Sequence, residues 1–318
     1  APPQSIGKFG GETDNWVWPR HTGDFSLFRI YANKDNKPAD YSDDNVPYKP
    51  AHFLPINISG VKEGDFVFVY GFPGRTNEFA PSSMLKLVSE QTNPVRIGIR
   101  DLRLAVWREA MLKNDTVKLQ YAAKFASVEN AYKKWKGELL GFQRFKVVEE
   151  KRRSENELTD PEIKRILLQY DDSLNAYKNL FKMNDLYSEA YGAIEICSNF
   201  SPCKNLIKWL SSPVPDKRLI DSEKAGIREF VKSTYKNYNA DVDRQMTGVM
   251  LHLLDSSLSA PLKPEFMKKK GFNMDRFVNE LFEKSYFTDA LKLNDLLASN
   301  DKKLLKKIKS AWLNSRQK

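Results

Sequence analysis

Cysteine and histidine are scarce in this sequence, and their scarcity excludes several kinds of site. Only two cysteines occur, Cys197 and Cys203, with no histidine near them, so they cannot supply the four ligands of a structural zinc site. They can close a small disulfide loop, which would indicate an oxidising compartment, or they can be two free buried thiols. From spacing alone, the two alternatives are nearly equal.

Long apolar runs are absent too. No uninterrupted run approaches the roughly 20 residues that a membrane-spanning helix requires, so we expect a soluble chain with no membrane span. The opening APPQSIGKFGG has neither an initiator methionine nor the basic and apolar regions of a signal peptide. We therefore expect a chain cut from something longer.

Positive charge exceeds negative charge in a chain of 318 residues. Lysine and arginine number 51 against 41 aspartate and glutamate, which gives a formal net charge of +10. Such a charge constrains only nonspecific association. Much of it lies in lysines spread along helical segments and in the tail DKKLLKKIKSAWLNSRQK, so solvated helix faces explain most of the excess, and we expect no nucleic-acid partner.

Runs of aromatic and branched residues indicate β structure in the first part of the chain. FSLFRIYA, from Phe25, and DFVFVYGF, from Asp65, are apolar at neighbouring as well as alternating positions, which is typical of strands buried on both faces. Turn segments rich in Asn, Asp and Pro separate them. Residues 1–78 hold too few strands to close a barrel, so we expect part of one.

From residue 79 to residue 318 the apolar spacing is helical. Four residues fall on one face of the helix predicted for RIGIRDLRLAVWREAM, namely Ile99, Leu102, Val106 and Ala110. Asp160 followed by Pro161 predicts the start of another helix, because Asp is a good N-cap and Pro suits the first helical position. Steps of four and three then separate Ile163, Leu167, Tyr170, Leu174, Tyr177 and Phe181. The sequence predicts a mainly α chain with a smaller β portion.

Polar and aromatic residues crowd into NWVWPRHTGD, from Asn15 to Asp24. Asp24 is either a turn-capping residue that accepts backbone N–H groups or the carboxylate that orients a histidine in a Ser-His-Asp triad. His21 lies too close in sequence to be its partner, and His52 and His252 fit packed structural roles. No serine lies in a G-x-S-x-G elbow, so the chain holds at most one member of a triad.

The segment GGETDNWVWPRHTGDFSLFRIYA resembles the signature of the bacterial serine exopeptidases that include dipeptidyl peptidases 7 and 11. GFPGRT and SVENAYKKWKG resemble further stretches of that family. In the family, a chymotrypsin-like double β-barrel carries the triad, and a large helical domain inserted between the barrels covers the cleft. The resemblance covers the whole chain, strongly up to about Gly137. It implies that residues 1–78 are the C-terminal part of the first barrel and residues 79–318 most of the helical cap (regulatory) domain.

The resemblance also implies roles for individual residues. Asp24 matches the triad aspartate, and Asn15, Trp16 and Asn130 match the clamp that holds a substrate's free α-ammonium. Amide oxygens and a backbone carbonyl would accept the ammonium N–H donors, while an aromatic face adds cation–π attraction. Without the family, Asn15 is interpreted as a turn residue and Asn130 as a polar residue on a helix surface.

The family's catalytic histidine lies upstream of these motifs and its serine downstream, and neither motif occurs in this sequence. The resemblance implies a bacterial serine dipeptidyl aminopeptidase, a homodimer in the periplasm, on the cell surface or secreted. It would remove dipeptides from oligopeptides with a free N-terminus and need no metal or organic cofactor. We expect this chain alone to be inactive, and its sequence predicts neither an acidic nor a hydrophobic preference. The alternative is a basic helical interaction or nucleic-acid-binding module.

Overall fold

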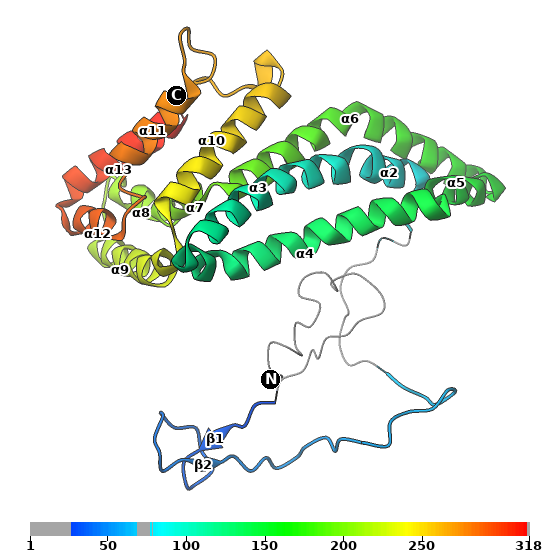
Figure 1. The fold of residues 1–318 in the computed structure, drawn as a ribbon, viewed down its shortest axis with the longest axis horizontal. Helices are drawn as coiled ribbons and strands as arrows, with labels where there is room; N and C mark the ends of the chain where they lie inside the picture. Colours follow the sequence, from blue (N-terminus) through cyan, green and yellow to red (C-terminus); the bar gives the residue numbers. More distant parts are fainter. Residues whose placement is uncertain (1–26, 69–76, 78, 317–318) are drawn as a thin grey trace. The chain divides into compact units, whose positions relative to one another are not determined.

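The chain divides into two units. The structure, a computed structural model, describes residues 27–68, 77 and 79–316. The first unit is Ala1–Phe79 and the second is Ala80–Lys318. Helices make up most of the described residues, as the sequence predicts, and every described helix belongs to the second unit (Figure 1).

The described strands of the first unit are short. β1 (Tyr31–Ala32) and β2 (Val46–Pro47) pair antiparallel, with Tyr31 opposite Pro47 and Ala32 opposite Val46. Between them, Asn33 holds a turn, because its side-chain oxygen accepts the backbone N–H groups of Asp35 and Lys37. A polar turn of this kind joins neighbouring strands.

The prediction of strands buried on both faces is wrong for the described part of this unit. Phe28 is 90% exposed and Phe66 is 91% exposed, and residues 66–68 form no strand. A strand is stabilised by a hydrogen-bonded neighbour and a covered face, and the described residues provide one two-residue pair. Ala32 is accordingly the only described residue of this unit that is buried. His52, expected to be packed, is exposed as well.

The second unit is built from helices of very different lengths. Its first group comprises α2 (Ser82–Leu87), η2 (Val88–Thr92), α3 (Asn93–Lys113), α4 (Asp115–Phe145), α5 (Val147–Glu157) and α6 (Pro161–Ala193). Its second group comprises α7 (Glu195–Phe200), α8 (Cys203–Leu210), α9 (Lys217–Thr234), η3 (Tyr235–Asn237), α10 (Ala240–Ser257), η4 (Ala260–Leu262), α11 (Met274–Lys284), α12 (Ala290–Ala298) and α13 (Asp301–Arg316). None of these described helices has both the length and the apolar character that a bilayer span demands.

Helix α3 is the central element of the first group. It packs along α4 on one side and α6 on the other, and α10 contacts both α3 and α6 (Figure 1). The core at one end of α3 includes Trp107 and Tyr121, whose ring centroids lie 5.6 Å apart and which are almost fully buried. The buried side chains of both helix groups form one continuous cluster. The second unit is therefore a single helical body with α3 and α10 at its centre.

Helices α2, η2 and α3 follow one another without a break. In η2 the backbone is a π-helix, and the N–H of Asn93 donates to the carbonyl of Val88, five residues back. Pro94 follows at once, and proline has no N–H to continue an α-helical ladder. The side chain of Gln91 donates to the carbonyl of Lys178 at 2.8 Å, which joins this turn to α6.

The start of α2 is held by a residue far away in the sequence. Glu155 of α5 accepts hydrogen bonds from the backbone N–H of Ser82 at 2.6 Å and from its hydroxyl at 2.5 Å. Helix α5 reaches this position because Lys146 adopts a left-handed conformation, with φ of 48°, and ends α4. A carboxylate at a helix N-terminus satisfies orphan N–H groups and interacts well with the helix dipole.

Helix α6 begins at Pro161, as predicted. The side chain of Asp160 accepts from the backbone N–H groups of Glu162 and Ile163. The regular apolar stripe along the helix, however, is largely uncovered: Tyr177, for example, is 56% exposed. The buried residues of α6 lie near its C-terminal end, namely Asp185, Leu186, Ala190 and Ala193. Periodicity therefore identified the helix, and tertiary contacts determine which part of the stripe is covered.

Candidate functional site

Among the predicted catalytic and substrate-binding residues, Asn130 alone falls in the part of the chain that the structure describes. Asp24, Asn15 and Trp16 lie outside it. Asn130 lies on α4 and is exposed, next to the buried pair Val128 and Glu129. The structure thus places it on the solvent face of a helix.

Local sequence explains why α4 presents Asn130 in this way. The helix begins at a strong N-cap, since the side chain of Asn114 accepts from the backbone N–H groups of Thr116 and Val117. Val117, Tyr121 and Val128 are its buried apolar residues, and steps of four and seven put them on one face of a helix. Asn130 follows Val128 by two positions, a rotation of about 200°. It therefore points away from the buried face.

Two arginines of α3 join α4 to α6 near this point. Arg96 donates to Asp185 through Nε and Nη2, at 3.0 and 2.6 Å. Arg100 donates to both carboxylate oxygens of Glu189, at 2.8 and 2.9 Å. Both guanidinium groups also approach the ring of Trp135 on α4, with centroid distances of 5.4 and 4.3 Å. Cation–π attraction and ion pairing thus combine on the same groups.

Further polar contacts lie along the same seam between α3 and α4. The hydroxyl of Tyr132 donates to Asp101, and the amide of Asn93 donates to Glu138 at 2.8 Å. Asn93 is almost fully buried, and a buried amide is stable only where it is hydrogen-bonded. The part of α4 that follows Asn130 is therefore held to α3 at several points.

Arg103 continues the arginine row of α3 into the core. Burial and, to a smaller extent, the nearby charge of Arg100 lower its pKa to about 10, although Glu189 and Glu195 oppose this change. Its guanidinium lies 4.5 Å from the centroid of the Trp107 ring. This arginine row was not predicted from the sequence. Its signal was the spacing of Arg96, Arg100 and Arg103, which places all three on one face of a helix.

The two cysteines are both free thiols in the structure, Cys203 buried and Cys197 exposed. Of the two alternatives left open by their spacing, the disulfide is therefore not present. The cysteines lie on separate helices, α7 and α8, and burial raises the pKa of Cys203 to about 12. A thiol with so high a pKa is a poor nucleophile, and the cysteines give no support for an oxidising compartment.

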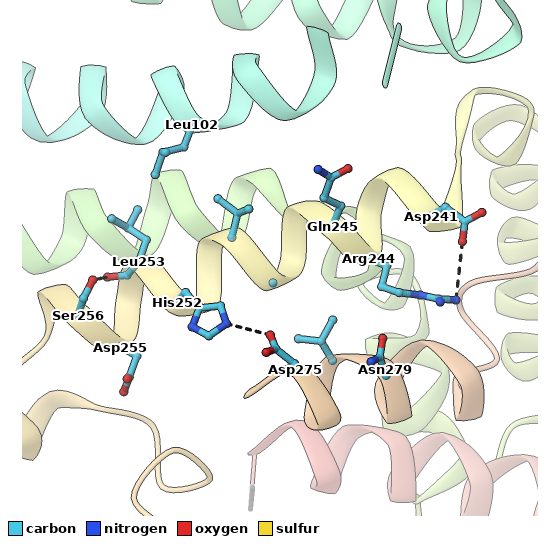
Figure 2. A pocket seen from close by; sticks show the side chains of 13 residues that line it. Leu102, Asp241, Arg244, Gln245, His252, Leu253, Asp255, Ser256, Asp275 and Asn279 are labelled. Carbon is cyan, nitrogen blue, oxygen red and sulfur yellow. Dashed lines mark hydrogen bonds and ion pairs between the residues drawn. The ribbon is translucent and has the colours of Figure 1, made fainter. Parts of the chain in front are cut away.

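A second candidate site is a groove of about 1000 Å³ lined by α10 and α11 with Leu102 of α3 (Figure 2). His252 lies in it and pairs through Nε2 with Asp275 at 3.0 Å. The side chain of His252 is 56% exposed, so the expectation of a packed histidine is wrong. Its imidazole does have a hydrogen-bond partner in Asp275. Ser256 on the same helix donates instead to the carbonyl of Leu253 (Figure 2). The groove therefore assembles no Ser-His-Asp triad.

Among the described residues, no group of three or more His, Cys, Asp and Glu side chains is arranged to hold a metal ion.

Comparison with known proteins identifies the family. Residues 1–313 match the model of the family described as Peptidase S46. The chain belongs to the peptidase S46 family. The resemblance to dipeptidyl peptidases 7 and 11 is thereby confirmed, whereas the alternative of a nucleic-acid-binding module finds no support.

Several S46 relatives align with nearly the whole chain. An Asp/Glu-specific dipeptidyl-peptidase of Capnocytophaga gingivalis is 39% identical over 297 residues, which cover 91% of this chain and 41% of the relative. Dipeptidyl-peptidase 7 of Porphyromonas gingivalis is 34% identical over 316 residues, which cover 95% and 43%. The crystal structure of Porphyromonas endodontalis DPP11 with the dipeptide Arg-Glu matches with a TM-score of 0.76 and 29% identity, covering 100% of this chain and 47% of that one. This chain spans less than half the length of these S46 relatives.

Proposed function

We propose that this chain is part of a serine dipeptidyl peptidase that removes dipeptides from the N-termini of oligopeptides. The observation that carries the proposal is the S46 match over residues 1–313, which includes the segment from Asn15 to Asp24 as well as Asn130. In this proposal, residues 1–78 are the C-terminal part of the first chymotrypsin-like barrel, and residues 79–318 belong to the helical cap. The helical character of the second unit fits the cap assignment.

Asp24 is the proposed triad carboxylate. It would orient a histidine and stabilise the imidazolium that forms when serine attacks the peptide carbonyl. Backbone N–H donors in the same enzyme would stabilise the tetrahedral oxyanion. The histidine and serine come from parts of the enzyme outside the motifs of this sequence, so the 318-residue chain alone should not turn over substrate.

Asn15, Trp16 and Asn130 are the proposed clamp for the substrate's α-ammonium. A dipeptidyl peptidase must recognise a charged amine two residues before the scissile bond, and amide oxygens are suitable acceptors for its N–H groups. Asn130 is exposed on α4, so its side chain is accessible to such a ligand. Two of the solved relatives are complexes with the dipeptides Arg-Glu and Arg-Asp, which have the same free amine.

The compartment and the assembly are proposed from the resemblance alone. We propose a periplasmic, cell-surface or secreted enzyme that is a homodimer in its full-length form. Fractionation of the native host and light scattering of the purified full-length enzyme test these two statements directly.

The clamp is tested in the full-length enzyme with Asn130→Ala and Asn15→Ala. Hydrogen bonds to a charged group are worth roughly 1.5 to 3 kcal/mol, so each substitution should lower kcat/KM for free-amine peptides by about tenfold to a hundredfold. Peptides with Asp or Glu and with a hydrophobic residue at the penultimate position are assayed in parallel. Equal losses for a free-amine peptide and its N-acetylated form would contradict the clamp.

Asp24 is tested separately, with Asp24→Asn in the full-length enzyme. Loss of the orienting carboxylate costs about 10⁴ in kcat in a serine protease, while the fold should remain. Near-normal kcat in a folded variant would contradict the triad role and show that Asp24 is a turn-capping residue.

A further inference from the structure

Arg100 makes more contacts with its neighbours than any simple ion pair requires. Its Nε and Nη2 donate to the two oxygens of Glu189 on α6, and its Nη1 donates to the backbone carbonyl of Val128 on α4 at 3.0 Å. Its guanidinium lies 4.3 Å from the centroid of the Trp135 ring, also on α4. A single side chain of α3 thus connects to both helices that flank it.

The environment makes these contacts strong. The side chains of Arg100 and Glu189 are 15% and 14% exposed, so water screens their attraction far less than that of a surface pair. Bidentate geometry adds directional preference to the charge attraction. Lysine cannot reproduce this arrangement, because its ammonium is a point charge without the planar fork or the stacking surface of arginine.

The contacts on α4 lie on either side of Asn130 in the sequence. Val128 precedes Asn130 by two residues and Trp135 follows it by five, which is less than one turn and about one and a half turns of helix. Helix α4 runs from Asp115 to Phe145, a length of 31 residues, and long helices bend readily. Arg100 therefore fixes the local axis of α4 at the place where Asn130 extends from it.

We propose that Arg100 is a positioning residue for recognition of the substrate's N-terminus, which it supports by holding the Asn130 segment of α4 against α3 and α6. The inference rests on the proposed function, in which Asn130 binds the α-ammonium. A hydrogen-bonding group must be held within about 0.5 Å of its productive position. The position of the Asn130 amide depends on the α4 backbone, to which Arg100 binds at Val128. Arg100 itself acts through that backbone and Glu189 is its anchor.

The test is a double-mutant cycle in the full-length enzyme with Arg100→Lys, Asn130→Ala and the combination of both. The measured quantity is the inhibition constant of the product dipeptide of the enzyme's best peptide substrate, compared with its des-amino analogue. We expect Arg100→Lys to raise the constant for the dipeptide by about threefold to tenfold, since misplacement of a positioned group weakens charged hydrogen bonds without removing them. The des-amino analogue should change less than about twofold, because it has no ammonium to misplace.

In the Asn130→Ala background, Arg100→Lys should then have almost no further effect on the dipeptide, because the group that it positions is gone. A full additional loss in that background would overturn the inference, and so would equal losses for the dipeptide and its analogue. If Asn130→Ala by itself left dipeptide binding unchanged, the proposed clamp would be wrong, and the role of Arg100 would be wrong as well. This result differs from failure of the Arg100 inference alone, in which Asn130→Ala weakens dipeptide binding and Arg100→Lys does not act through Asn130.

Two more variants distinguish a specific effect of the Arg100 contacts from a general loss of stability. Glu189→Gln keeps the size of the side chain and weakens the bidentate anchor, so it should shift the dipeptide constant in the same direction by a smaller factor; an unchanged constant in folded Glu189→Gln would contradict the anchor. Lys224→Met is the control, since it breaks another ion pair of the second unit that has a buried cation, Lys224 with Asp301 at 2.7 Å, between α9 and α13. It should lower the melting temperature and leave both inhibition constants unchanged.

Discussion

At the scale of single residues, Asp243 of α10 binds the first backbone N–H groups of α7. Its carboxylate accepts the backbone N–H groups of Glu195 and Ile196, each at 2.7 Å, and the hydroxyl of Tyr238 at 3.1 Å. It is 1% exposed. Burial and, to a smaller extent, the charge of Glu195 raise its pKa to about 7, although the three hydrogen bonds oppose the rise.

The pKa of Asp243 predicts how stability depends on pH. Because the folded-state pKa of about 7 lies above the ordinary value of 3.8, the stabilisation from proton binding is complete below about pH 4 and is lost as the pH rises through 7. Asp243→Asn removes this titration. We expect the melting temperature of the native chain, relative to that of Asp243→Asn, to fall between pH 4 and pH 8.

Thermal denaturation of both proteins across this range measures the difference, and titrations common to both cancel. A difference that is flat with pH would mean that Asp243 titrates near its ordinary value in the folded chain. A difference that grows toward alkaline pH would mean that the hydrogen bonds outweigh burial and lower the pKa.

At the scale of the helices, the carboxylate of Glu155 is a long-range cap for α2. Its two hydrogen bonds to Ser82 replace the side-chain cap that Pro81, at the N-cap position, cannot provide. Glu155→Ala should lower the free energy of unfolding by about 1 to 2 kcal/mol, the usual cost of losing an N-cap or a charged hydrogen bond. Glu157→Ala, at an exposed position of the same helix, is the control and should change it by less than about 0.5 kcal/mol. Urea denaturation compares the two, and equal effects would show that the cap contributes nothing.

Helix α6 should be stable at one end and labile at the other. Its buried residues begin at Asp185, while Ile166 and Leu168 in its early turns are 52% and 67% exposed. Amide protons in poorly packed helical turns exchange through local opening, so protection should be low near Pro161 and high from Asp185 to Ala193. Hydrogen exchange with mass spectrometry measures the gradient. Uniform protection along α6 would show that another surface covers its early turns in solution.

The helices illustrate what the sequence predicts and what it does not. The start of α6 was predicted because its cap is local, with Asp160 and Pro161 adjacent to the turn that they stabilise. The pair Arg100 and Glu189 was not, because its members are 89 residues apart and only the packing of α3 against α6 brings them together. The prediction of the β strands was wrong for a related reason, because a strand depends on neighbouring strands and packing partners that are distant in the sequence.

Of the catalytic and substrate-binding residues predicted from the sequence, one lies in the part of the chain that the structure describes. Asn130 lies on a helix surface, as its local pattern indicates, and its role as a clamp came from the family resemblance. The role itself stays a prediction. The arginines of α3 and Trp135 of α4 carry no motif that marks them, since aromatic and basic residues at helical spacing are common in ordinary packed helices.

At the scale of the whole chain, the two units differ sharply in burial. The second unit has a continuous core, whereas Ala32 is the one buried residue described in the first. Proteases cut where local opening is easy, so limited proteolysis of the chain should remove peptides from residues 27–68 first. The helical fragment that remains should begin near Ala80, as mass spectrometry of the digest can establish. Early cleavage within α3 or α10 would contradict the assignment of the core.

The π-helical turn η2 has a consequence for changes in chain length. It lies between two fixed points of one rod, Ser82 bound to Glu155 on one side and Arg96 and Arg100 bound to α6 on the other. Deleting one residue from it would restore uniform α-helix with little change in helical phase, because a π-helical turn holds one residue more than the α-helical turn that it replaces. A deletion within α2 or the first turn of α3 would instead rotate α2 relative to α3 by about 100°, which turns Ser82 away from its acceptor. The tolerance of this rod to a change in length is thus expected at η2 and not in the α-helical turns beside it.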